Sequence, residues 1–234
     1  MIKTGLKEIG SFFSTLDVVT KVLVTINTLV YLYNIMENKM NAIKGLTIEQ
    51  ILNTGGMSGG TSLTTIITSM FAHYSLSHFL VNMITLLLLS HVLSDTFSPM
   101  MYLFTLFFSG MLGNILTYTI EPHVVSLGAS GGIYGIIGLL LVASLQHKRY
   151  PSLNSLFIWI FSTAILFVVM TFFSDISNNI SHIIGFITGA LIALVIPLVK
   201  PNRDNPEWWN ATYIADFNYD VDRCNSVYTG INFR

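Results

Sequence analysis

The chain has 234 residues, of which 52% are hydrophobic and only 10% are charged, and its mean hydropathy is +0.65. Soluble domains carry about 25% charged residues, so this composition excludes an ordinary soluble protein and predicts an integral membrane protein. The formal net charge of −1 gives no reason to expect a nucleic acid partner, and the single Cys224 cannot form an internal disulfide.

Six apolar segments approach the roughly 20 residues that a helix needs to cross a bilayer. They predict an all-α, polytopic membrane protein built as a bundle of six transmembrane helices. The first segment is interrupted by Lys21, Asn27 and Asn34. In chain order, the expected spans are Val18–Ile35, Leu76–Leu93, Met100–Ile120, Ser130–Leu145, Leu153–Phe173 and Ser181–Val199.

Basic residues predict the orientation of this bundle. The membrane domain is expected at residues 18–199, between a short N-terminal segment, 1–17, and a polar tail, 200–234. With six spans, both termini and the loop between the fourth and fifth spans lie on one side of the membrane. The basic residues of these three segments are Lys3, Lys7, Lys148, Arg149, Lys200 and Arg203, against Lys39 and Lys44 opposite. The positive-inside rule therefore predicts that both termini are cytoplasmic.

Polar residues gather where the second, fourth and sixth spans begin. In this topology all three spans enter from the outer side, so their first turns lie at a similar depth. Strongly polar groups inside a membrane are costly and usually functional. The residues at these openings are His73, His78 and Asn82, then Ser130 and Tyr134, then Asn179 and His182. Their convergence predicts one site formed by three distant segments.

Ser130 and His182 are the candidate catalytic pair. A serine hydroxyl is a poor nucleophile until an adjacent base takes its proton, and His182 is the natural base if the fourth and sixth helices touch. Glu121 and Asp175 lie in outer loops without an obvious way to orient this histidine, so a Ser–His dyad is expected rather than a triad. Tyr134 lies one helical turn after Ser130, and its ring is expected to pack against the imidazole.

The remaining residues of the site are expected to bind the negative charge of a tetrahedral intermediate. His78 and Asn82 share one helical face and can both donate hydrogen bonds. The backbone N–H of Ser130, at the positive end of its helix, is a third possible donor. Close approach of the fourth and sixth helices is favoured by two small-xxx-small pairs, Gly131 and Gly135 with Gly185 and Gly189.

Each element of this site also has a simpler interpretation. Taken alone, Ser130 is more often a helix N-cap than a nucleophile, and His182 can be a helix–helix hydrogen bond. The pair His73 and His78 is compatible with a metal, but a spacing of five places these side chains on different helical faces. "GASGG" fits the nucleophile elbow of soluble α/β-hydrolases, which requires a preceding strand that the hydropathy argues against.

Together, these motifs resemble those of the rhomboid family of intramembrane serine proteases. The resemblance covers roughly residues 18–199 and rests on three motifs in order. They are His73–x4–His78–x3–Asn82, Gly128-Ala129-Ser130-Gly131 with Tyr134, and His182–x2–Gly185–x3–Gly189.

This resemblance implies a role for each residue. Ser130 would be the nucleophile and His182 the base, while His78, Asn82 and the Ser130 amide would form the oxyanion site. The supporting residues would be His73 for the loop, Tyr134 stacked on His182, and Gly128 admitting the substrate backbone. The family also implies transmembrane protein substrates in the lipid bilayer, cleaved near the outer face without a metal or other cofactor. The six-helix core is typical of bacterial members, so a bacterial plasma membrane is the expected location.

Two positions depart from the family pattern. Thr64 and Thr65 stand where many rhomboids carry a Trp-Arg pair, and Ser94, beside Asp95, stands where many carry a glutamate. Both family features are structural, so the departures bear on loop geometry and stability more than on the chemistry.

Three further expectations concern mechanism and class. Hydrolysis needs water, so the loop Glu121–Ala129 is expected to dip inward and line a wet cavity. Substrates with small or helix-breaking residues near the cut are expected to be preferred, because a helix must unwind before cleavage. The competing hypotheses are a catalytically inactive rhomboid-like protein that binds transmembrane clients, and a small transporter, which would want charged groups near mid-membrane.

Overall fold

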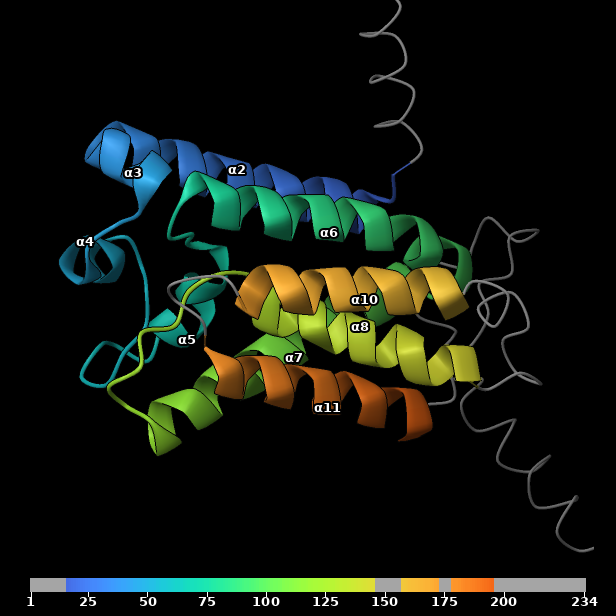
Figure 1. Ribbon diagram of the computed structural model, residues 1–234. Helices are drawn as coiled ribbons and strands as arrows, with labels where there is room; N and C mark the ends of the chain where they lie inside the picture. The colour runs from blue at the N-terminus through green and yellow to red at the C-terminus, as the bar shows by residue number, and fades with distance from the viewer. Residues whose placement is uncertain (1–15, 146–156, 173–177, 196–234) are drawn as a thin grey trace, which may run out of the picture. The chain divides into compact units, whose positions relative to one another are not determined.

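The computed structural model describes residues 16–145, 157–172 and 178–195 (Figure 1). These residues are helical apart from turns, loops and one isolated antiparallel bridge between Met57 and Ser126. The elements are α2 (Val18–Asn38), α3 (Met40–Lys44), α4 (Ile48–Asn53), α5 (Thr65–Thr68), the 3-10 turn η1 (Ser69–Phe71), α6 (Leu76–Thr96), α7 (Pro99–Ile120), α8 (Ser130–Leu145), α10 (Phe157–Phe172) and α11 (Asn179–Val195). The predicted all-α class is confirmed. The predicted tail, 200–234, and nearly all of the N-terminal segment lie outside the described residues.

Short polar side chains set where the long helices begin. Asp17 caps α2 by accepting the N–H of Thr20 at 2.9 Å. Ser75 caps α6 in the same way, and Ser98 caps α7, whose first residue is a proline. These caps satisfy backbone N–H groups that would otherwise lack partners at the helix ends.

The lengths of the described helices support part of the six-span prediction. α2 and α7 are each long and apolar enough to cross a membrane. A third span results if the segment Thr65–Phe71 is counted together with α6, from which it is bent by 88°. α8, α10 and α11 are apolar but shorter in their described parts. That the protein has six membrane spans stays a prediction.

Two of the three polar residues that interrupt the first span lie on its inner face. Asn27 and Asn34 of α2 are buried, and they share one helical stripe with Leu23 and Tyr31. Lys21 is exposed on a different face of the helix. The two asparagines that looked unfavourable for a membrane span therefore point into the protein, whereas Lys21 does not.

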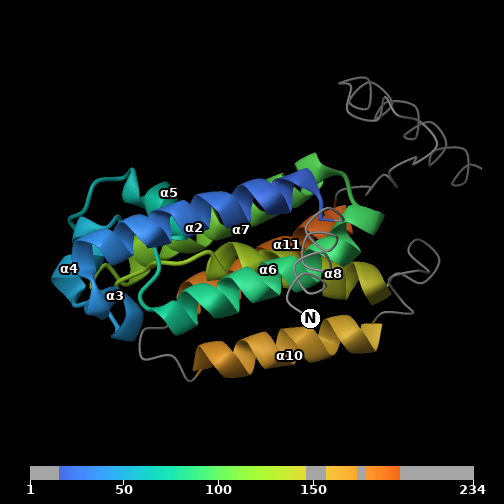
Figure 2. The same cartoon turned by 90° about the horizontal axis from the view of Figure 1, so that it is seen from above.

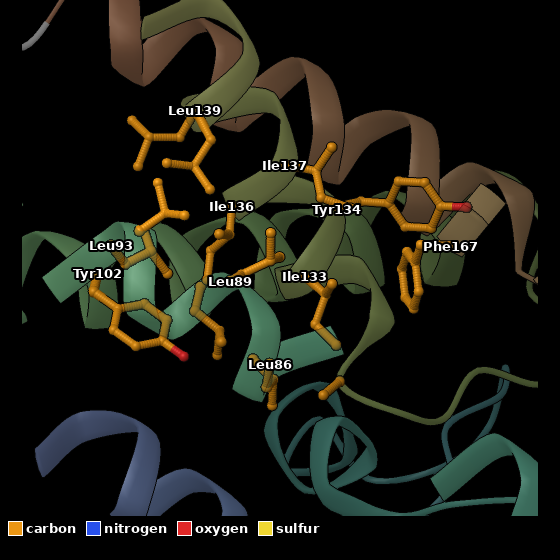
Figure 3. Packing of buried hydrophobic residues seen from close by; sticks show 14 of the residues in the cluster. Leu86, Leu89, Leu93, Tyr102, Ile133, Tyr134, Ile136, Ile137, Leu139 and Phe167 are labelled. Carbon is orange, nitrogen blue, oxygen red and sulfur yellow. The ribbon is translucent and has the colours of Figure 1, made fainter. Parts of the chain in front are cut away.

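α8 is the central helix of the described bundle. All but Leu141, Val142 and Leu145 of its residues are buried. Side chains of α6 and α8 interdigitate on one side, where Leu86 and Leu89 lie near Ile133 and Ile136 (Figure 3). α10 lies at the edge of the bundle, against α6 and α8 (Figure 2).

Glycines bring α8 and α11 into direct backbone contact. A Cβ atom added at Gly185 would overlap the carbonyl oxygen of Gly131, and one at Gly189 would overlap that of Gly135. The predicted close approach of these two helices is therefore confirmed. Inside a bilayer, lipid is as apolar as a leucine side chain, so such contacts stabilise the bundle through van der Waals packing.

Candidate active site

Ser130 and His182 are hydrogen bonded to each other. The distance from Ser130 Oγ to His182 Nε2 is 2.8 Å, and both residues are buried. Ser130 is the first residue of α8 and His182 lies in the first turns of α11, so the glycine contact between these helices brings the pair together.

The hydroxyl of Ser130 does not act as the cap of its helix. The N–H of Ile133 donates to the carbonyl of Ala129 at 3.0 Å, so Ala129 occupies the capping position and Ser130 is the first helical residue. The N-cap interpretation of Ser130 is therefore wrong, and its side chain instead bonds the imidazole.

Tyr134 stacks on His182, as the spacing along α8 predicted. The two ring centroids are 4.5 Å apart and the planes differ by 27°. The Tyr134 ring also contacts Phe167 of α10, with centroids 5.0 Å apart (Figure 3). The imidazole plane is thus supported by an aromatic group that is itself packed against a third helix.

Gly128 lies directly against the ring of His78. Its φ of +106° is a backbone conformation that side chains disfavour, and its N–H donates to the carbonyl of Ser69 at 2.8 Å. A Cβ atom at this position would lie 2.7 Å from Cε1 and 2.9 Å from Nε2 of His78. The residue two before Ser130 must therefore be a glycine if His78 is to keep its place.

His78 has a defined tautomer in this arrangement. Its Nδ1 accepts the backbone N–H of Tyr74 at 3.4 Å, which leaves the proton on Nε2. Because Nε2 is the ring nitrogen nearest to Gly128, the imidazole presents an N–H donor beside the segment that leads into Ser130.

Asn82 and His73 both contact His78. The amide of Asn82 is buried and donates to the carbonyl of His78 at 2.8 Å, so its described contact lies within α6. His73 is also buried, and its ring meets His78 edge-on with centroids 5.3 Å apart. Its Nδ1 donates to the carbonyl of Phe71 at 3.2 Å, while the amide of Asn34 donates to the His73 carbonyl at 3.2 Å. The inner face of α2 thus holds the bend that carries His73.

The loop before Ser130 is held by a polar cluster that we did not predict. The Asn114 amide donates to the Ile66 carbonyl at 2.9 Å and to the Ser69 hydroxyl at 3.0 Å, while its oxygen accepts the hydroxyl of Ser126 at 2.9 Å. Met57 and Ser126 exchange both backbone hydrogen bonds. The later part of this loop follows the predicted inward course, since Ser126 and Ala129 are buried, whereas residues 121–123 are exposed; the wet cavity stays a prediction. The rule applied to the other openings would have found Asn114, since it is an amide inside an apolar span.

A second missed cluster lies at the start of α11. Asn178 caps this helix by accepting the N–H of Ser181 at 3.0 Å, and its amide donates to the Thr117 hydroxyl of α7 at 2.9 Å. The sequence prediction placed the neighbouring Asn179 at this opening, but that residue is exposed.

Comparison with models of protein families identifies the family of this chain. A model of the Rhomboid domain matches residues 60–198, which is more than half of the chain. The chain belongs to the rhomboid family. Membership of this family agrees with the apolar helices described above, which indicate an integral membrane protein.

Individual rhomboids are distant relatives and include proteins named as inactive. Rhomboid-like protease 3 of Toxoplasma gondii is 28% identical over 63% of this chain and 56% of its own length. Inactive RHOMBOID-like protein 8 of Arabidopsis thaliana is 26% identical over 66% of this chain and 45% of its own. Rhomboid protease GluP of Bacillus subtilis is 26% identical over 58% of this chain and 26% of its own. The chain thus spans between about a quarter and just over half of the length of these three relatives.

One departure from the rhomboid pattern is visible in the structure. Thr65 begins α5, directly after Thr64, and its hydroxyl donates to the Ser62 carbonyl at 2.6 Å and lies 2.9 Å from the Thr61 hydroxyl. Hydroxyl groups therefore hold this turn where many rhomboids carry a Trp-Arg pair. The side chains at the other departure, Ser94 and Asp95, lie outside what the structure describes.

Proposed function

We propose that this rhomboid is an intramembrane serine endopeptidase that cleaves transmembrane segments near the outer face of the membrane with a Ser–His dyad. The observation that carries the proposal is the 2.8 Å hydrogen bond between Ser130 Oγ and His182 Nε2. A histidine nitrogen within hydrogen-bond reach of a buried serine hydroxyl is the arrangement that activates serine as a nucleophile.

In the proposed mechanism, His182 Nε2 takes the hydroxyl proton as Ser130 Oγ attacks the substrate carbonyl carbon. The tetrahedral intermediate collapses to an acyl-enzyme when the imidazolium returns this proton to the leaving amine. Water then attacks the ester, with His182 again acting as base, and releases the second product. Tyr134 holds the imidazole plane through both proton transfers, since its ring lies 4.5 Å from that of His182.

The oxyanion site is proposed at the start of α8. The N–H of Ser130 belongs to the first turn of the helix, where backbone donors have no intrahelical acceptor and the helix dipole is positive. The Nε2–H of His78, beside Gly128, is the second donor. Asn82 has one amide N–H bonded to the His78 carbonyl, so its second N–H is the third candidate donor.

We further propose six membrane spans with both termini in the cytoplasm, and a bacterial plasma membrane as the location. This places the starts of α6, α8 and α11 toward the outer face. The partners are then transmembrane substrate proteins within the lipid bilayer, with small or helix-breaking residues near the cut.

Purified protein in proteoliposomes with a transmembrane reporter substrate tests the proposal. Wild type is expected to cleave the reporter and to label with a fluorophosphonate probe, while Ser130→Ala does neither. Equal cleavage by the two proteins, or no cleavage by folded wild type, would refute the protease function.

The second candidate is a catalytically inactive rhomboid-like protein that binds transmembrane clients. It is favoured by one observation, namely that a relative 26% identical to this chain is named inactive. The same experiment separates the two functions, because an inactive protein would retain the reporter in co-purification without cutting it or reacting with the probe.

A further inference from the structure

A buried polar pair joins α7 to the start of α11, and no step of the proposed mechanism uses it. The amide of Asn178 donates to Thr117 Oγ1 at 2.9 Å, and both side chains are buried. The Thr117 hydroxyl in turn donates to the Gly113 carbonyl of its own helix at 2.9 Å. Because this chain of bonds runs between two helices, it fixes where α11 begins relative to α7.

Hydrogen bonds from the first turn of α11 to Asn178 link the position of Asn178 to that of His182. Its side-chain oxygen accepts the N–H of Ser181 at 3.0 Å, and its carbonyl accepts the N–H of His182 at 3.2 Å. A helix advances about 1.5 Å and turns roughly 100° with each residue. Moving the start of α11 by a single residue would therefore swing the imidazole away from Ser130.

The same turn of α11 packs between α7 and α8. A Cβ atom added at Gly113 or at Gly131 would lie 2.6 Å or 2.5 Å, respectively, from the hydroxyl oxygen of Ser181. The glycines make room for the helix, and hydrogen bonds add directional restraint to this packing. Besides the Ser130–His182 bond itself, the directional bonds at this turn come from Asn178 and Thr117.

We infer that Thr117 and Asn178 are positioning residues for the base of the dyad. The inference rests on the proposed function and goes beyond the residues assigned to it. Thr117 acts on the imidazole only through the cap. Its loss is therefore expected to slow the chemical step rather than to weaken substrate binding.

The test is Thr117→Val, which keeps the side-chain shape and removes the hydroxyl. We expect kcat to fall about 10- to 100-fold, because displacing a catalytic group by about 1 Å can cost about 10²-fold. KM should stay within about 2-fold of wild type, since uniform substrate binding is unchanged. Thr117→Ser, which restores the hydroxyl, should recover most of kcat.

Thr188→Val is the matched control. Thr188 is a buried threonine of α11, but within the described part of the chain its hydroxyl bonds only the Ile184 carbonyl of its own helix, at 2.7 Å. The same substitution here removes an intrahelical bond and leaves the α7 link intact, so kcat should stay near wild type. Thermal unfolding of all variants in one detergent sets an assay temperature at which each is folded.

The outcomes separate this inference from the proposed function. Wild-type kcat in Thr117→Val, or a raised KM at unchanged kcat, overturns the inference while active wild type keeps the protease function. A loss of kcat that Thr117→Ser does not recover also overturns it. Folded wild type that neither cleaves the reporter nor labels with the probe overturns both. Loss of kcat in Thr117→Val alone, recovered by Thr117→Ser and absent in Thr188→Val, supports it.

Discussion

Replacing Gly128 by alanine is expected to disable the site without unfolding the protein. The added Cβ would lie 2.7 Å from Cε1 of His78, closer than real Cβ atoms approach, so the imidazole must move. Its Nε2–H would then leave the position beside Gly128 from which it is proposed to stabilise the oxyanion. Losing one such donor lowers kcat by about 10²–10³-fold.

The backbone strain of this substitution must be separated from the collision with His78. Gly128 has a φ of +106°, and an alanine held in a sparsely populated backbone conformation costs about 1–3 kcal/mol of stability. Gly60 provides the control, because its φ is +91° and a Cβ atom there meets nothing within 4 Å. Gly60→Ala should therefore show the strain without the collision.

Initial cleavage rates of the reporter in proteoliposomes, together with thermal unfolding in one detergent, measure the two effects. Both alanine variants are expected to unfold at lower temperature than wild type, and only Gly128→Ala should lose activity by about 10²-fold or more. If Gly128→Ala cleaves within about 3-fold of Gly60→Ala at a temperature where both are folded, the role given to His78 is wrong.

Substitutions at three further positions test other contacts of the site. His182→Ala should lower kcat by about 10⁴-fold or more while the protein stays folded, and turnover near that of wild type would remove His182 from its role. Tyr134→Phe should keep most activity, because it retains the ring that stacks on the imidazole, whereas Tyr134→Ala should lose about 2- to 10-fold in kcat; equal rates in the two variants would contradict a stacking role. Gly189→Ala should destabilise the fold by about 1–3 kcal/mol in a denaturant titration, since its Cβ would overlap the backbone of Gly135, and unchanged stability would contradict the close helix contact.

Much of the candidate site could be anticipated because polar residues stand out in apolar segments. Ser130, His182 and Tyr134 needed only helical spacing and the assumption that the fourth and sixth helices touch, and the glycines of both helices indicated that contact. The predicted starts of α6 and α8 also agree with the structure, because a serine cap and a glycine-rich loop mark them in the sequence.

Other features depend on partners that are remote in sequence and so carried no local signal. The choice between Asn178 and Asn179 at the start of α11 is decided by the Thr117 hydroxyl, 61 residues earlier in the chain. Asn34 looked like a defect in the first span, because its bond to the His73 carbonyl requires the 88° bend before α6. The capping position of Ala129 is likewise invisible in sequence, since a serine beside it is the more usual cap.

The backbone contact between α8 and α11 also has a consequence for biosynthesis. The nucleophile and its base are separated by 52 residues of chain, and the base is on the last helix that the structure describes. A nascent chain that has delivered α8 to the membrane holds Ser130 without His182, and Gly131 and Gly135 still lack their contacts with Gly185 and Gly189. In the proposed mechanism the chain has no protease activity until Gly185 and Gly189 pack the final helix against α8. Proteolytic competence would then arise only at completion of the fold, and a truncated or half-inserted copy would pose no hazard to neighbouring membrane proteins.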